Sequence, residues 1–202
     1  MSYVTLTFLG MLLALQSCFA SHHEYNPDNK FYKATTKALV KVAIPLSERY
    51  SEVLEKVVED LKAHEEAPKY EHQIEHLEKL MKGFKHIKAD SDEEILQNII
   101  DLKNDGAGAQ EPSNESSNPH LVRDLFEKDG GKELAEEIRK DFVEFFDGFD
   151  DAFDEYAKEL SEEEKAEHED FLKWFKEFKE ADSFEKKLDK FFEFFKFFHH
   201  KE

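Results

Sequence analysis

One short segment carries the spacing of a zinc site. The sequence His-Gln-Ile-Glu-His at residues 72–76 matches the inverted zincin pattern, in which two histidines bind zinc and the glutamate is general base. Histidines four residues apart share a helix face, so the local spacing suits a metal. A peptidase also needs a third ligand and a substrate cleft, and the chain predicts no sheet to build them. The histidines lie opposite Tyr70, Ile74 and Leu77, so we predict a solvated helix face and no metal site, with adventitious surface binding as the alternative.

A second group of charged residues has the chemistry to bind calcium, because carboxylate oxygens are the ligands that this ion prefers. The segment lacks the loop spacing of an EF-hand, and carboxylates on one helix rarely converge on a single ion. A solvated face of an amphipathic helix is the simpler interpretation. The carboxylates are Asp141, Glu144, Asp147, Asp150, Asp151, Asp154 and Glu155.

No residue pattern marks a nucleophile. The chain has no Gly-x-Ser-x-Gly sequence, no glycine-rich phosphate loop, and a single cysteine, Cys18. We therefore predict that the protein is not an enzyme and needs no cofactor. Its net charge of −19, with no basic patch, also predicts that it does not bind nucleic acid.

The first twenty residues have the pattern of a secretory signal peptide. An apolar run over residues 8–15 is followed by the small residues Cys18 and Ala20 and then by polar residues. No Lys or Arg precedes the run, and a lipoprotein signal that uses Cys18 is the alternative. Cleavage after Ala20 predicts a secreted, extracellular chain without cysteine. No later segment is long and apolar enough to span a bilayer, so we expect no integral membrane segment in the mature chain.

The remaining chain predicts an all-α fold. Its apolar residues recur every three or four positions in a composition rich in good helix formers. Residues 104–119 are rich in Gly, Pro, Ser and Asn, which predicts a flexible linker. The expected organisation is a signal peptide at 1–20 and two similar helical-bundle halves, 21–103 and 120–202, joined by this linker. The linker contains a sequon at Asn114 that would be a glycosylation site in a secreted chain.

The two halves resemble copies of one another. Residues 80–91 parallel residues 171–183 with one insertion, and the apolar positions that follow continue in register. The matched pairs are Leu96 with Leu188, Ile99 with Phe191, Ile100 with Phe192, and Leu102 with Phe194. Upstream, the register places Pro45 opposite Gly148, and we expect both long helices to be interrupted there. We infer a tandem duplication.

The halves differ in charge and in aromatic content. Residues 21–110 have a charge balance of −5, and residues 121–202 have a balance of −12. The second half also holds 16 of the 20 phenylalanines. Where the first half uses Leu, Ile and Val, the second uses Phe, which suggests that its apolar interior has a task beyond packing.

The C-terminal segment Phe191–Phe198 concentrates this excess. Its phenylalanines, with Phe184 and Leu188, spread over roughly 220° of a helical wheel, against the ~100–120° that a surface helix buries. Three interpretations remain open: a helix in the middle of its bundle, the lining of a site for a fatty or isoprenoid ligand, or an exposed patch that docks a protein, a second copy or a lipid surface.

The overall profile is secreted, cysteine-free, helical and rich in Glu, Lys and Phe. It resembles that of invertebrate helical lipid carriers, such as the nematode fatty-acid and retinol-binding proteins and the apolipophorins. The resemblance is one of composition, and it implies a non-enzymatic carrier of a fatty-acid-like or retinoid-like lipid. The alternative is a secreted interaction factor or effector that binds a protein partner, or self-associates as a homo-oligomer, through the Phe-rich C-terminal helix. For the carrier, we expect the hydrophobic ligand to contact Phe142, Phe145, Phe146, Phe149, Phe153, Phe171, Trp174, Phe175, Phe178, Phe191, Phe194, Phe195 and Phe198.

Overall fold

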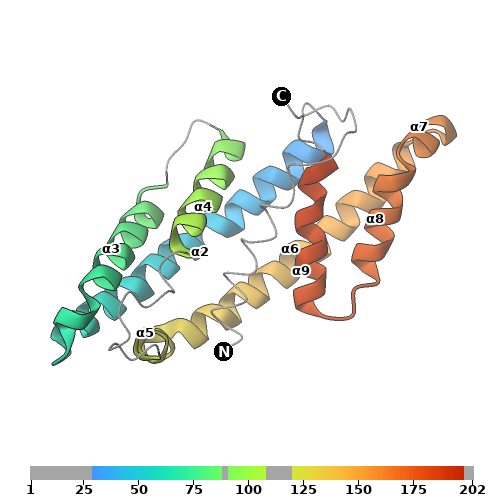
Figure 1. Cartoon of the computed structure of the whole chain (residues 1–202). Coiled ribbons are helices and arrows are strands. Elements are labelled where there is room, and N and C mark those ends of the chain that lie inside the picture. The colour runs from blue at the N-terminus through green and yellow to red at the C-terminus, as the bar shows by residue number, and fades with distance from the viewer. Residues whose placement is uncertain (1–28, 88–90, 108–119, 198–202) are drawn as a thin grey trace. The chain divides into compact units, whose positions relative to one another are not determined.

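The computed structural model describes residues 29–87, 91–107 and 120–197, and every regular element in these ranges is a helix (Figure 1). The predicted all-α fold is therefore confirmed. The elements are α2 (Lys30–Ala63), η1 (Ala67–Tyr70), α3 (Glu71–Lys85), α4 (Asp92–Ala107), α5 (Leu121–Phe126), η3 (Glu127–Gly131), α6 (Lys132–Glu159), α7 (Glu162–Glu167), α8 (Glu169–Lys179), α9 (Phe184–Glu193) and η4 (Phe194–Phe197). The predicted signal peptide, the sequon at Asn114 and Phe198 lie outside the described residues. None of the helices in the described ranges has the length and apolar character needed to cross a membrane.

The described chain groups into two compact units, and both contain part of α2 and part of α6. Unit 1 comprises the described residues from Val40 to Ile138, and unit 2 comprises Asn29–Leu39 with the described residues from Arg139 onward. These units do not follow the division at a central linker that the sequence suggests. Each long helix has an apolar face along its whole length, so its two ends can contribute to two different cores.

Unit 1 has a mainly aliphatic core. The buried face of α2 in this unit consists of Val53, Leu54, Val57, Val58 and Leu61. Helix α3 packs beside α4, and a Cβ atom added at Gly83 would overlap the side chain of Leu102. The absence of a side chain at Gly83 therefore lets the two helices approach closely.

Neither long helix is interrupted where the sequence predicts it. Helix α2 continues through Pro45, and α6 continues through Gly148. Proline removes one backbone hydrogen bond, but the helix around Pro45 is held by burial of Leu39 and Leu46, which are 3% and 2% exposed. The first residues of the predicted linker are also helical, because α4 runs to Ala107.

Serine side chains cap two helices of unit 2. Ser161 accepts a hydrogen bond from the backbone of Glu164, and the Glu164 carboxylate accepts one from the backbone of Ser161, which completes a capping box at α7. Ser183 caps α9 by accepting from a backbone N–H of its first turn. These caps fix where the helices of unit 2 begin.

Tyr50 of unit 1 packs between two phenylalanines and provides a pH test of the fold. Its ring centroid lies 5.2 Å from that of Phe84 and 5.8 Å from that of Phe126. Burial raises the pKa of Tyr50 to about 12, against about 10 for an unfolded tyrosine. Because the folded pKa is the higher one, the stabilising contribution of this neutral phenol is complete below about pH 10 and is lost as the pH rises towards 12.

We expect a spectrophotometric titration to show that Tyr50 ionises near pH 12 and that unfolding accompanies this step. The Tyr50→Phe variant should lose this ionisation and keep its helix content to higher pH. A Tyr50 that titrates with a pKa near 10, without loss of structure, would contradict the burial described above.

Candidate functional site

The residues that the sequence assigns to a ligand site lie together in unit 2. The described members all have exposed fractions of 8% or less. Phe142, Phe145, Phe146, Phe149 and Phe153 lie on α6; Phe171, Trp174, Phe175 and Phe178 lie on α8; Phe191 lies on α9, and Phe194 and Phe195 on η4. We call these residues the aromatic cluster.

The helical repeat explains how so many rings meet. On α6 the phenylalanines recur at spacings of three and four residues, which places them on one face of the helix. Phe171, Trp174, Phe175 and Phe178 repeat the pattern on α8. When these stripes pack against α9, the rings of all three helices point into one interior.

Phe149 lies among rings from several elements. Its ring centroid is 5.4 Å from that of Phe178 on α8, 5.2 Å from that of Phe191 on α9 and 5.6 Å from that of Phe194 on η4. These three pairs are edge-to-face, with interplanar angles of 87–88°. Such pairs contribute about 0.5–1.5 kcal/mol each beyond their buried area.

Phe31 and Tyr32 contact the aromatic cluster but were not predicted as site residues. Phe31, on the first turn of α2, has its centroid 5.5 Å from that of Phe149 and 5.8 Å from that of Phe194. Tyr32 stacks on Phe194 with a centroid distance of 6.1 Å. Both belong to the half of the sequence that was assigned to the other bundle, so spacing alone gave no signal for this contact.

The C-terminal Phe-rich segment is buried within its own unit. Phe191, Phe192, Phe194 and Phe195 are between 0% and 4% exposed. The segment changes from α-helix to 3-10 helix at Phe194, which tightens the turn and alters the direction of the last side chains. The wide apolar arc is therefore accommodated by packing in the described part of the segment.

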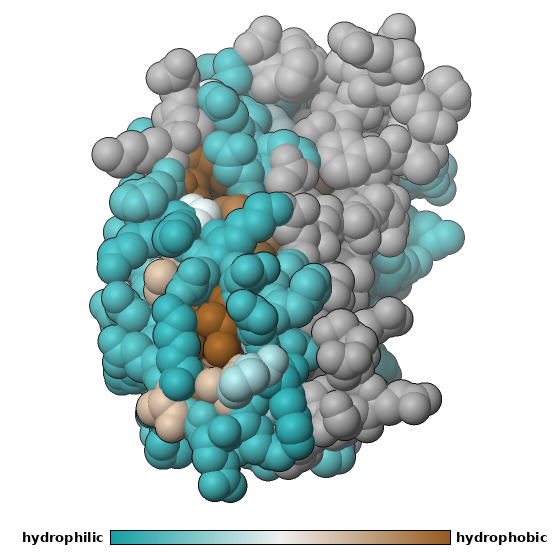
Figure 2. Space-filling view, turned by 60° about the vertical axis from the view of Figure 1, so that its left-hand side comes forward, coloured by the Kyte–Doolittle hydropathy of each residue, from teal (hydrophilic) through white to brown (hydrophobic). Residues whose placement is uncertain are grey.

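The described surface exposes few large apolar side chains. Among the described residues, Val143 is the one large hydrophobic residue that is exposed, with an exposed fraction of 46%. The coloured part of the face in Figure 2 is mainly hydrophilic, and hydrophobic residues are visible there between polar side chains.

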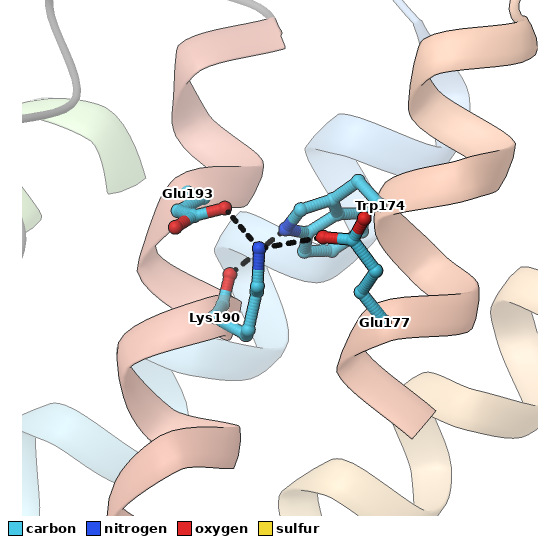
Figure 3. Close-up of polar contacts among 4 residues, drawn as sticks. All are labelled: Trp174, Glu177, Lys190 and Glu193. Atoms are coloured by element: carbon cyan, nitrogen blue, oxygen red, sulfur yellow. Dashed lines mark hydrogen bonds and ion pairs between the residues drawn. The ribbon is translucent and has the colours of Figure 1, made fainter. Parts of the chain in front are cut away.

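A polar contact joins α8 to α9 at the edge of the cluster (Figure 3). Trp174 donates its indole N–H to the backbone oxygen of Lys190 at 2.9 Å, so its one polar atom is satisfied. The Lys190 ammonium in turn donates to Glu177 at 2.8 Å and to Glu193 at 3.1 Å. The hydrogen bond to Glu177 is the main reason that the pKa of Lys190 is raised.

A second polar contact joins α9 to α6. The Lys187 ammonium lies 3.2 Å from Asp150 Oδ2, and both side chains are about one-fifth exposed, at 22% and 21%. The same ammonium lies over the rings of Phe178 and Phe146, at 4.8 and 5.7 Å from their centroids. Desolvation raises the pKa of Asp150, although Lys187 acts in the opposite direction.

The segments with metal-like spacing do not form a metal cluster in the described structure. Within residues 29–87, 91–107 and 120–197, no three or more His, Cys, Asp or Glu side chains converge as metal ligands would. His72 is exposed, as predicted, but His76 is half-buried, because Gln73 and Leu80, one turn away from it on α3, are buried. Two carboxylates of the acidic segment are paired, Asp150 with Lys187 and Asp154 with Lys179.

Comparisons with protein families, characterised proteins and solved structures found no match to this chain. The functional argument therefore rests on the geometry of the aromatic cluster.

Proposed function

We propose that the protein is a secreted, non-enzymatic carrier that binds one hydrophobic molecule among the aromatic side chains of unit 2. The proposal includes the tandem duplication inferred from the sequence, in which α3 and α4 correspond to α8 and α9. Its main support is a difference at matched positions between these two helix pairs.

The register of the duplication pairs Gly83 with Trp174 and Leu102 with Phe194. In unit 1, Gly83 leaves no room for even a Cβ atom against Leu102. In unit 2, the rings of Trp174 and Phe194 face each other at a centroid distance of 5.9 Å. In this register the smallest residue is replaced by the largest, so more side-chain volume lies between α8 and η4 than between the matched positions of α3 and α4.

An aliphatic core is sufficient for the packing of unit 1, so packing alone does not require this exchange. Ile99 and Phe191 occupy matched positions, and both are buried, at 4% and 0% exposed. Larger side chains give unit 2 a larger apolar interior, with flat faces and no polar atom to satisfy apart from the Trp174 indole. Such an interior suits a ligand of fatty or isoprenoid character, for which aromatic and aliphatic linings are typical.

The rings of the cluster are buried in contact with one another, so we expect some of them to move when a ligand enters. Helix α9 is the element whose movement would open the cluster, because it carries Phe191 and leads into η4. Its polar contacts to α8 and α6, through Lys190 and Lys187, lie at the partly exposed edge. Ion pairs of this kind contribute little to stability, so breaking them would add little to the free energy needed to move α9.

Burial also favours the carrier over the interaction factor. An interaction site built on Phe191, Phe194 and Phe195 would need these side chains at the surface, and they are 4% exposed or less. The same burial supports contact of these side chains with a ligand held inside the cluster.

The sole tryptophan reports on the proposed site. Trp174 contacts Phe171, Phe178 and Phe194 within the cluster. We expect its emission to change, in a saturable way and at one ligand per chain, when the protein is titrated with decanol. Unchanged emission and the native mass of the bare chain, with decanol and with decanoate in a parallel titration, would contradict the proposal.

A variant that moves the tryptophan to the matched position in unit 1 shows which unit binds the ligand. In the register of the duplication, Phe84 of unit 1 corresponds to Phe175, next to Trp174. The double variant Trp174→Phe, Phe84→Trp moves the reporter to unit 1, and its emission should not respond while its native mass still shows bound decanol. A response from position 84 would place the ligand in unit 1 and contradict the assignment to the aromatic cluster.

A further inference from the structure

One buried polar atom beside the aromatic cluster has no hydrogen-bond partner. Asp150 accepts from Lys187 through Oδ2, at 3.2 Å, but its Oδ1 is buried without a donor. Asp150 lies on α6 at the flank of the phenylalanine stripe, one turn after Phe146 and one turn before Phe153, and its partner Lys187 lies over the ring of Phe146. A buried acceptor without a donor is unfavourable, and a group that donates to it gains a charge-assisted hydrogen bond.

The charges around Asp150 decide which head group can approach. Lys187 on α9 is engaged by Oδ2, and Lys179 on α8 is engaged by Asp154 at 3.1 Å. Asp147, one turn earlier on α6, adds a second negative charge that acts on Asp150. A carboxylate ligand would therefore approach two carboxylates whose neighbouring ammonium groups already have partners. A neutral hydroxyl group meets no such repulsion and supplies the missing donor.

We propose that the ligand of the aromatic cluster is a long-chain alcohol, whose terminal hydroxyl donates a hydrogen bond to Asp150 Oδ1 while its hydrocarbon chain lies among the phenylalanine rings. This inference rests on the proposed carrier function and specifies the chemical class of the ligand. Asp150 is the specificity-determining residue, and the Lys187 ammonium, over the rings of Phe146 and Phe178, holds its carboxylate in place.

The test compares two ligands of equal chain length on the full chain. Decanol and decanoate each compete with the neutral fluorescent probe N-phenylnaphthylamine, and their dissociation constants are obtained from its displacement. We expect decanol to bind at least about tenfold more tightly than decanoate, since one charge-assisted hydrogen bond is worth about this ratio. Equal affinities, or tighter binding of decanoate, would overturn the inference and leave the carrier proposal intact. If neither ligand displaces the probe or changes Trp174 emission, the carrier proposal itself fails.

Two isosteric variants show whether Asp150 is responsible. Asp150→Asn removes the negative charge and releases the Lys187 ammonium for a ligand carboxylate, so the preference for decanol should fall to about threefold or less. Asp151→Asn makes the same charge change at the neighbouring exposed position and should keep the preference of the unmodified protein. An Asp150→Asn protein with an unchanged preference would overturn the inference. If Asp150→Asn fails to fold, the comparison of decanol with decanoate on the unmodified chain still tests the inference.

Discussion

Replacement of Phe191 by alanine should lower the free energy of unfolding by about 3–5 kcal/mol, the cost of removing a fully buried aromatic ring. Phe191 is 0% exposed. Its ring centroid lies 5.0 Å from that of Phe145 and 5.2 Å from that of Phe149, so alanine would leave a cavity between α9 and α6. The measurement is equilibrium denaturation followed by circular dichroism.

Val143→Ala is the matched control for this variant. Val143 is also an apolar side chain of unit 2, but it is 46% exposed, and truncation there should change the free energy of unfolding by no more than about 0.5 kcal/mol. Similar effects of the two variants would show that Phe191 does not lie in a packed interior. The description of the C-terminal segment as core would then be incorrect.

The second large effect is expected at Gly131, immediately before α6. A Cβ atom there would lie 2.6 Å from the backbone oxygen of Phe126 and would overlap the ring of the same residue. Because a backbone atom cannot move aside as a side chain can, we expect Gly131→Ala to destabilise the protein by about 2–3 kcal/mol. Denaturant titration measures this difference.

Gly148 is the internal control for Gly131. It lies within α6, and an added Cβ atom would meet nothing within 4 Å. Alanine is a better helix former than glycine, so Gly148→Ala should stabilise the protein by up to about 1 kcal/mol. The two Gly→Ala variants should thus have opposite signs. A neutral Gly131→Ala, or a destabilising Gly148→Ala, would contradict the packing around α6.

The local structure was largely predictable because local rules determine it. The periodicity of apolar residues identified the helices, and α7 and α9 begin at serines, Ser161 and Ser183, a residue type that commonly caps helices. The spacing of the phenylalanines on α6 and α8 was also sufficient to predict which face of each helix is buried. These features depend on residues three or four positions apart, which a single sequence displays directly.

The tertiary grouping was not predictable in the same way. Pro45 and Gly148 are residues that break helices on their own, but burial on both sides of each position keeps α2 and α6 continuous. Phe31 packs against Phe149 even though the linker was expected to separate their halves. The pairing of Lys187 with Asp150 likewise depends on how α9 lies against α6. Such contacts depend on the assembled core, and no local pattern encodes them.

The composition of the aromatic cluster is compatible with the proposed duplication. In that register, Trp174 and Phe194 occupy the positions that Gly83 and Leu102 occupy in unit 1, where Gly83 lies close against Leu102. The backbone of Lys190 satisfies the Trp174 indole. The proposed ligand, with a long apolar chain and one hydroxyl group, would match the aromatic side chains and the unsatisfied oxygen of Asp150.

The most direct test of the carrier proposal is the titration of the full chain with decanol, read by Trp174 emission and by native mass spectrometry on the same samples. The proposal predicts a saturable change in emission and a mass increase of one decanol per chain. A constant emission spectrum and the mass of the unliganded chain at every concentration of decanol, and of decanoate in a parallel titration, would contradict it, and the aromatic cluster would then be a structural core alone.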